Sequence, residues 1–203
     1  MSIVYRTDST GREHQIWAQR QANSCAVAAI WMARNQASQM SMEETEWELA
    51  WRIYQHTVEG IEWGRTSSAN APTGPMSIDP RAYQSNQSSF YNMFGSFGTF
   101  AKQVAASLRS DGYTVGHSKN SGTAQQINVA KIGPTQPAIV LVGWYSNQGG
   151  NVQRNGGHFV VAAGRAGTRI VYLDPWGGNL YEFPNNARYQ NNGLIEEVIY
   201  LSA

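Results

Sequence analysis

Apolar residues follow a helical pattern in the first half of the chain. Ser24 to Asn35 is apolar on every face, which is typical of a helix buried in the middle of a domain. Met42 to His56 follows a capping box and carries aromatic residues at helical spacing, so it predicts a second helix. A third helix is expected from about Phe97 to Asp111, with Gly112 in the position that commonly ends a helix.

The pattern changes to short strands after Pro137. A last short helix, Ala124 to Ile132 with Thr123 as its cap, is expected before this point. Runs rich in β-formers then alternate with Gly- and Asn-rich turns. The predicted strands are Ala138 to Trp144, Phe159 to Ala163, Arg169 to Leu173, Leu180 to Phe183 and Leu194 to Leu201. Helices followed by an antiparallel meander indicate the α+β class, with two lobes packed on each other.

Residues 64–98 interrupt this organisation. Gly, Pro, Ser and Asn dominate the segment, with aromatic residues interleaved. Such a composition favours a long loop insertion over a domain boundary. Since 203 residues fit one domain, we predict a single domain spanning residues 1–203 that carries this insertion.

Composition and charge narrow the classes of function. Fifteen Lys and Arg against fourteen Asp and Glu leave a net charge of +1, without the basic excess of a nucleic-acid binder. The single cysteine excludes an intramolecular disulfide and a Cys-cluster metal site. The longest apolar run, Pro137 to Trp144, is too short to span a membrane, and the N-terminus lacks the apolar core of a signal peptide. The chain is therefore expected to be soluble and made in the cytoplasm.

Cys25 is the sharpest chemical feature, because it stands at the start of the buried helix. Unpaired N–H groups and a partial positive charge at a helix N-terminus favour a thiolate over a thiol. The alternative is a small apolar side chain in the core, since free cysteine is among the most buried residue types. Position alone does not separate these two interpretations.

His158 and Asp174 favour the catalytic interpretation. His158 stands between Gly156-Gly157 and a predicted strand, and Asp174 ends the next strand sixteen residues later. Adjacent antiparallel strands would bring these two strand ends within reach of each other. A thiol nucleophile needs a base to take its proton, and an imidazole base needs a partner that sets its tautomer. Cys25, His158 and Asp174 supply all three parts.

These motifs resemble the papain-like cysteine peptidase superfamily, and most closely its C39-type (double-glycine) peptidases and related bacterial toxin domains. The resemblance implies a two-lobed fold, in which an N-terminal helical lobe with the central nucleophile helix packs on a C-terminal antiparallel sheet. It assigns Cys25 as the nucleophile, His158 as the general base and then acid, and Asp174 as the orienting acid. Ala26 departs from the Gly that follows the cysteine in many C39-type members.

The resemblance also implies a glutamine that donates to the oxyanion together with the N–H of the cysteine. Gln19 stands six residues before Cys25, which is the spacing in the family, and Gln21 stands four before it. Gln19 is the preferred candidate, with Gln21 as the alternative.

The expected function is a cysteine endopeptidase that cleaves a protein substrate through a thioester acyl-enzyme. Resemblance to C39-type enzymes implies cleavage after small residues such as Gly-Gly. It further implies a bacterial effector or toxin domain, delivered into the cytoplasm of a target cell and inhibited by a cognate immunity protein. The alternatives are a deamidase or transglutaminase with the same triad, and a binding module on an inactive papain-like fold. No cofactor is expected.

The remaining histidines do not have the spacing that is typical of a metal site. His14 is placed in a polar N-terminal stretch, His56 at a helix end and His117 in a loop, with no common spacing to carboxylates. We therefore predict no zinc site. Trp176, which follows Asp-Pro, would either shield the His–Asp pair from water or pack as an ordinary core residue.

Overall fold

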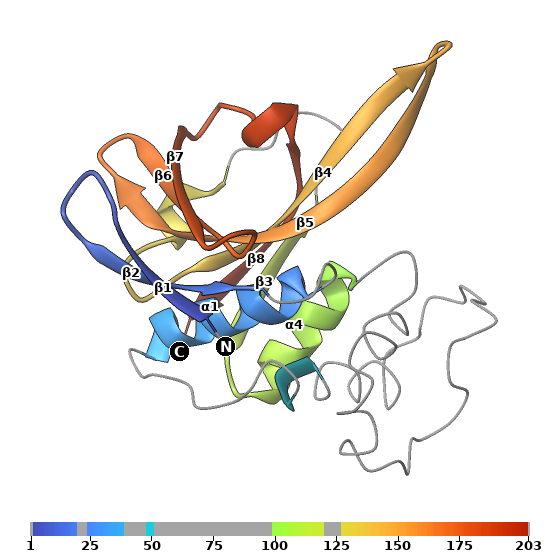
Figure 1. Ribbon diagram of the computed structural model, residues 1–203. Coiled ribbons are helices and arrows are strands. Elements are labelled where there is room, and N and C mark those ends of the chain that lie inside the picture. The colour runs from blue at the N-terminus through green and yellow to red at the C-terminus, as the bar shows by residue number, and fades with distance from the viewer. Residues whose placement is uncertain (1, 20–23, 39–47, 51–98, 120–126, 203) are drawn as a thin grey trace, which may run out of the picture.

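The computed structural model describes residues 2–19, 24–38, 48–50, 99–119 and 127–202 (Figure 1). The helices are α1 (Cys25–Ser38) and α4 (Ala101–Ser110), and residues 48–50 are also helical. The strands are β1 (Ser2–Thr7), β2 (Glu13–Ala18), β3 (Thr114–Lys119), β4 (Ala138–Gln148), β5 (Asn151–Ala166), β6 (Arg169–Asp174), β7 (Asn179–Pro184) and β8 (Leu194–Ser202). The predicted α+β class is confirmed.

A six-stranded antiparallel sheet dominates the described part of the chain, in the order β3-β8-β4-β5-β6-β7. The strands β1 and β2 form a separate hairpin. The predicted simple meander is wrong at one step, because β8 pairs with β4 and β3 instead of with β7. The reason lies in β4, whose first residues are buried on both faces and therefore need a paired strand on each side.

Alternate residues of the central strands face two apolar clusters. Ile139 and Val161 pack with α1, while Val140 and Val160 contribute to the cluster on the other face. Figure 1 shows α1 and α4 together on one side of the sheet. Trp17 of β2 meets Trp31 of α1 edge to face, with 5.0 Å between the ring centroids. Helix α1 is thus enclosed between the sheet and the N-terminal hairpin.

Two of the predicted helices have the expected position. Helix α1 begins at Cys25 and runs through the predicted segment. Gly112 follows α4 with φ +88°, and its N–H donates to Arg109 O at 3.0 Å. The next N–H, of Tyr113, donates to Leu108 O at 3.1 Å, which completes a glycine-dependent helix stop.

Three strands were missed by the sequence pattern. The polar N-terminal stretch forms the β1–β2 hairpin, and residues 114–119 form β3 at one edge of the sheet. Strands β1 and β3 have no buried residue, and the buried residues of β2 are His14 and the short pair Ile16 and Trp17, so none of the three carries the long apolar run by which a strand is normally detected. His117 consequently lies on a strand, and its predicted place in a loop is wrong.

The predicted helix before the sheet is also wrong in its described part. Only a 3₁₀ turn, Val129–Lys131, is present there, and the Asn128 side chain accepts from the Ala130 N–H. The proposed cap Thr123 lies outside the described residues, as does the insertion at 64–98 and most of the predicted second helix.

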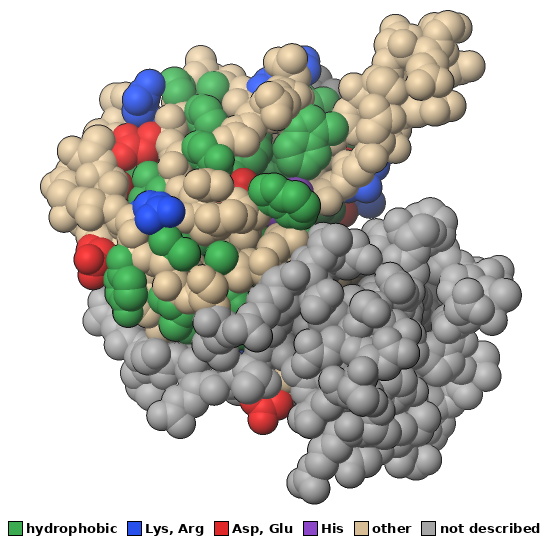
Figure 2. Space-filling view, viewed as in Figure 1, with side chains coloured by type: hydrophobic (Ala, Val, Ile, Leu, Met, Phe, Trp, Pro, Cys, Tyr) green, Lys and Arg blue, Asp and Glu red, His purple; other side chains and the backbone are tan. Residues whose placement is uncertain are grey.

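Charged side chains are scattered singly on the face shown in Figure 2, in agreement with the balanced composition. No helix within the described ranges is long and apolar enough to cross a membrane.

Candidate active site

Helix α1 positions Cys25 at its first residue. The side chain is half-buried, whereas the residues that follow it, Ala26 to Ala33, are fully enclosed in the core. A helix held on all sides leaves its first residue little freedom to move. Cys25 therefore lies where the free amides of the first helical turn converge.

Strands β5 and β6 bring His158 and Asp174 together. Val161 is paired with Leu173 in the antiparallel register, so His158, three residues before Val161, and Asp174, directly after Leu173, belong to the same end of the two strands. His158 Nε2 donates to Asp174 Oδ1 at 2.6 Å. Asp174 is 4% exposed, so this bond forms in a largely dry environment, where a charged hydrogen bond is strong.

The ring of His158 interacts with Cys25 as well as with Asp174. Burial lowers the pKa of His158, but the hydrogen bond to Asp174 and the interaction with Cys25 outweigh burial and raise the pKa to about 9. Since Nε2 is occupied by Asp174, Nδ1 is the ring nitrogen left for the sulfur. At neutral pH the raised pKa keeps the His158 imidazole protonated.

Asp174 is held by two further donors. The Trp176 N–H donates to Oδ1 at 2.7 Å, and the Tyr189 hydroxyl donates to Oδ2 at 2.6 Å. Both oxygens of the buried carboxylate thus have partners, as a buried charge requires. Burial raises the pKa of Tyr189, and the negative charge of Asp174 raises it further, so its hydroxyl keeps the proton that it donates.

The N-terminal hairpin reaches the same site through Gln19. This residue follows β2, and its backbone N–H donates at 2.9 Å to the carbonyl of Pro175, the neighbour of Asp174. The hairpin also packs closely on Gly178, where a Cβ would lie 2.9 Å from Val4. Gln19 is therefore anchored to the turn that carries Asp174. Gln21 lies outside the described residues.

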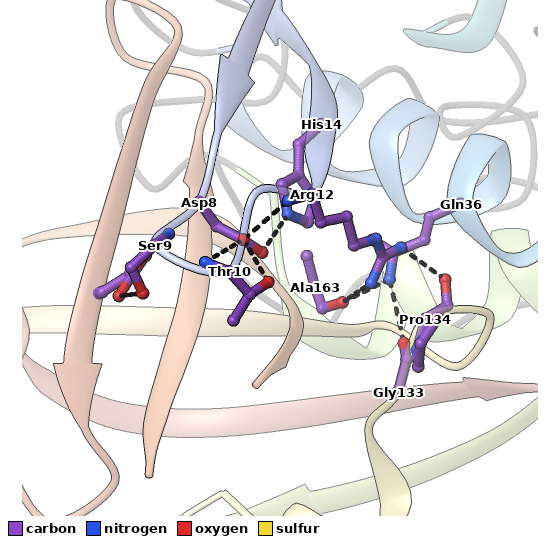
Figure 3. Close-up of polar contacts among 10 residues, drawn as sticks. Asp8, Ser9, Thr10, Arg12, His14, Gln36, Gly133, Pro134 and Ala163 are labelled. Carbon is purple, nitrogen blue, oxygen red and sulfur yellow. Dashed lines mark hydrogen bonds and ion pairs between the residues drawn. The ribbon is translucent and has the colours of Figure 1, made fainter. Parts of the chain in front are cut away.

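The other predicted residues lie away from this site or have other partners. His14, in the polar N-terminal stretch, is buried and pairs with Asp8 at 2.9 Å (Figure 3). His117 pairs with Glu197 at 2.7 Å. His56 is outside the described residues, among which no three His, Cys, Asp or Glu side chains cluster as a metal site would require.

Trp176 is not a core residue, since 61% of its surface is exposed. Its contribution to the His–Asp pair is the backbone hydrogen bond to Asp174. Sequence reasoning missed Tyr189 because it stands fifteen residues after Asp174 in a polar segment with no recognisable strand or helix pattern. Trp144 was missed for a similar reason. It ends a predicted strand, and only the fold brings its ring to 6.5 Å from that of His158.

No protein-family model matches the chain, and neither does any curated protein. Among solved structures, the chain is similar to the peptidase domain of Streptococcus ComA, a bi-functional ABC transporter involved in a quorum sensing pathway. The two are 13% identical, the similarity covers 92% of this chain and 96% of that one, and the TM-score is 0.49. At this degree of similarity, the function has to be inferred from the site itself.

Proposed function

We propose that this chain is a papain-like cysteine endopeptidase with Cys25, His158 and Asp174 as its catalytic residues. The observation that carries the proposal is the pair formed by His158 and Asp174 at 2.6 Å, with the pKa of His158 raised by Asp174 and Cys25 together. A cysteine at a helix N-terminus beside an imidazolium is the arrangement that activates a thiol for attack on a carbonyl.

In the proposed reaction, the Cys25 thiolate attacks the carbonyl carbon of the scissile peptide and a C–S bond forms. The carbonyl oxygen becomes an oxyanion. As the C–N bond breaks, the His158 imidazolium gives its proton to the leaving amine, and a thioester remains. His158, now neutral, takes a proton from water as the water oxygen attacks the thioester carbon and a C–O bond forms. The C–S bond then breaks, which releases the new carboxyl terminus and regenerates the thiolate–imidazolium pair.

The oxyanion would be stabilised by the backbone N–H of Cys25 and the side chain of Gln19. The first donor is supported by the helix start at Cys25, whose amide is free of an intrahelical partner. The second is supported by the bond from Gln19 to Pro175, which ties this residue to the turn that holds Asp174. Two preorganised donors of this kind are the usual source of oxyanion stabilisation in acyl transfer.

Substrate and context rest on the sequence resemblance alone. It implies cleavage after small residues such as Gly-Gly, and a delivered effector whose producer carries an inhibitory immunity protein. Both belong to the proposal, and the experiment below tests the first of them, because the residues before each new terminus give the cleavage specificity.

The decisive experiment compares protein termini in cells that express the wild-type chain or Cys25→Ala. New termini that appear only with the wild type are expected, and the residues before them report the specificity. Incubation of purified chain with the proteins so identified should reproduce the cuts. Identical termini in both samples would contradict a peptidase, and a small mass increase of an intact protein would instead indicate deamidation.

A further inference from the structure

The loop formed by residues 189–193 folds back onto the His–Asp pair. Tyr189 and Gly193 exchange both backbone hydrogen bonds, at 2.9 and 3.0 Å, which closes the loop tightly. Asn191 and Asn192 between them have φ of 50° and 64°, a left-handed conformation that asparagine tolerates. A Cβ at Gly193 would lie 2.6 Å from Val142, so the absence of a side chain lets the 189–193 loop lie directly on β4.

Two contacts connect the 189–193 loop with the catalytic pair. The Tyr189 hydroxyl donates to Asp174 Oδ2 at 2.6 Å. Gln190 O accepts from Trp144 Nε1 at 2.9 Å, and the ring of Trp144 lies 6.5 Å from that of His158. One short loop therefore contacts Asp174 directly and His158 through the indole of Trp144.

The ring of Tyr189 has little room to move. It is 3% exposed and is surrounded edge to face by other aromatic rings. Its ring centroid lies 5.3 Å from that of Tyr172, 5.6 Å from that of Phe183 and 6.1 Å from that of Tyr181. A hydroxyl on a ring packed in this way presents its proton to Asp174 from a fixed direction.

We propose that Tyr189 is a positioning residue that holds the Asp174 carboxylate in the rotation required by His158, an inference that rests on the proposed function. Oδ1 alone accepts from both His158 and the Trp176 N–H. The carboxylate can still turn about its own bond unless Oδ2 is held as well. Tyr189 is the side chain that the structure gives to Oδ2. Loss of the Tyr189 hydroxyl would leave the buried Oδ2 without a hydrogen-bond donor. The Asp174 carboxylate would then rotate away from His158 Nε2 toward another donor.

The test measures the rate at which iodoacetamide alkylates Cys25 at pH 6 in wild type, Tyr189→Phe, Asp174→Ala and the double variant. This rate reports the thiolate–imidazolium pair and needs no substrate. Tyr189→Phe should slow alkylation by about fivefold, and should have no further effect, within about twofold, once Asp174 is alanine. Equal effects of Tyr189→Phe in both backgrounds would overturn the inference, because Tyr189 would then not act through Asp174.

Tyr181→Phe is the matched control. Tyr181 belongs to the same aromatic cluster, and its hydroxyl makes no hydrogen bond to any residue in the described ranges. It should alkylate at the wild-type rate. A loss in Tyr181→Phe equal to that in Tyr189→Phe would assign the effect to packing and overturn the inference.

Proton NMR of His158 provides a second measurement. A short hydrogen bond to a buried carboxylate moves the Nε2 proton far downfield. This signal should be sharp in wild type and Tyr181→Phe, and broadened or lost in Tyr189→Phe. If Tyr189→Phe does not fold, Trp144→Phe releases the 189–193 loop but keeps the hydroxyl, and should broaden the same signal. An unchanged signal in whichever variant is folded would overturn the inference.

The outcomes also separate this inference from the proposed function. Wild-type alkylation no faster than that of free cysteine would refute the activated thiol, and with it the peptidase. Fast wild-type alkylation that Tyr189→Phe leaves unchanged would refute the role of Tyr189 alone.

Discussion

The described part of the chain contains two histidine–aspartate pairs with similar hydrogen-bond lengths, in which the pKa of the histidine is shifted in opposite directions. His158 and Asp174 are 2.6 Å apart, and His14 and Asp8 are 2.9 Å apart. The pKa of His158 is raised to about 9, whereas that of His14 is lowered. Burial lowers the pKa in both cases, so the difference comes from the neighbours.

The neighbours of His14 are structural. Arg12 lies close enough to lower the pKa of His14 further, against the effect of Asp8. The guanidinium of Arg12 donates to Pro134 O at 2.9 Å, and Gln36 donates to Ala163 O at 2.6 Å beside it (Figure 3). This cluster joins the β1–β2 turn and α1 to the sheet. His158 instead has Cys25 as its second neighbour, and the interaction with Cys25 raises the pKa of His158. In the proposed peptidase, Cys25 as a third partner is what distinguishes the His158–Asp174 pair from the His14–Asp8 pair.

The largest expected effect is on kcat, which should depend on the His158–Asp174 pair and not on the His14–Asp8 pair. Cys25→Ala and His158→Ala should each lower kcat by roughly a thousandfold or more, because each removes a group that the reaction needs. His14→Gln should leave kcat within a few fold and should instead lower the free energy of unfolding by about 1–3 kcal/mol, since it disturbs a buried hydrogen bond. Peptide hydrolysis and urea denaturation measure the two quantities. Loss of activity in a folded His14→Gln variant would contradict the purely structural role assigned to the His14–Asp8 pair.

The next effect concerns the oxyanion. Gln19→Ala should lower kcat by about a hundredfold or more with little change in stability, as is usual when one oxyanion donor is removed. Gln21→Ala should remain within a few fold. Steady-state kinetics on the two purified variants rank the residues. The reverse ranking would transfer the role to Gln21, and small equal effects would indicate an oxyanion hole made of backbone amides alone.

A smaller effect is expected on the orientation of His158. Asp174→Asn should keep part of the activity that Asp174→Ala loses, because an amide oxygen can still accept from Nε2 while the Tyr189 hydroxyl turns to accept from the amide nitrogen. We expect Asn to exceed Ala by about tenfold in kcat, an order of magnitude set by one buried hydrogen bond. Wild-type activity in Asp174→Ala would show that another residue orients His158.

The smallest effect is on the pH dependence of stability, where the two pairs should have slopes of opposite sign. The pKa of His158 is raised from 6.5 to about 9. Its ionisation therefore adds at most about 3 kcal/mol to the free energy of unfolding, an amount that is fully present below pH 6.5 and is lost as the pH rises through 9. The pKa of His14 is lowered, so the fold loses stability as the pH falls below 6.5. The pKa of Asp8 is about 2 against 3.8, and its contribution is lost between these values as the pH falls further.

Urea denaturation between pH 5 and 9 should reveal these slopes when wild type is compared with His158→Gln and His14→Gln. The wild-type advantage over His158→Gln should shrink toward pH 9, and the advantage over His14→Gln should shrink toward pH 5. Slopes of the same sign would contradict the opposite ionisation of the two histidines.

Local pattern determined the parts of this protein that depend on neighbours in sequence. The all-round apolar segment identified the helix that begins at Cys25, and apolar runs identified the strands after Pro137. His158 and Asp174 were predictable as partners because antiparallel strands joined by a short turn have a simple geometry. The helix and the strands follow from the periodicity of apolar residues, and the candidate site follows from the reactivity of cysteine, histidine and aspartate side chains.

Tertiary structure alone decided the rest. The strands β1 and β3 expose most of their side chains, so only their paired partners define them. The position of β8 depends on the need of β4 for a partner on each side. The environments of His14 and Tyr189 likewise depend on where the hairpin turn and the 189–193 loop pack. Hydrogen bonds between segments far apart in sequence leave no periodic pattern in either segment, because their energy is realised only when the whole chain has folded.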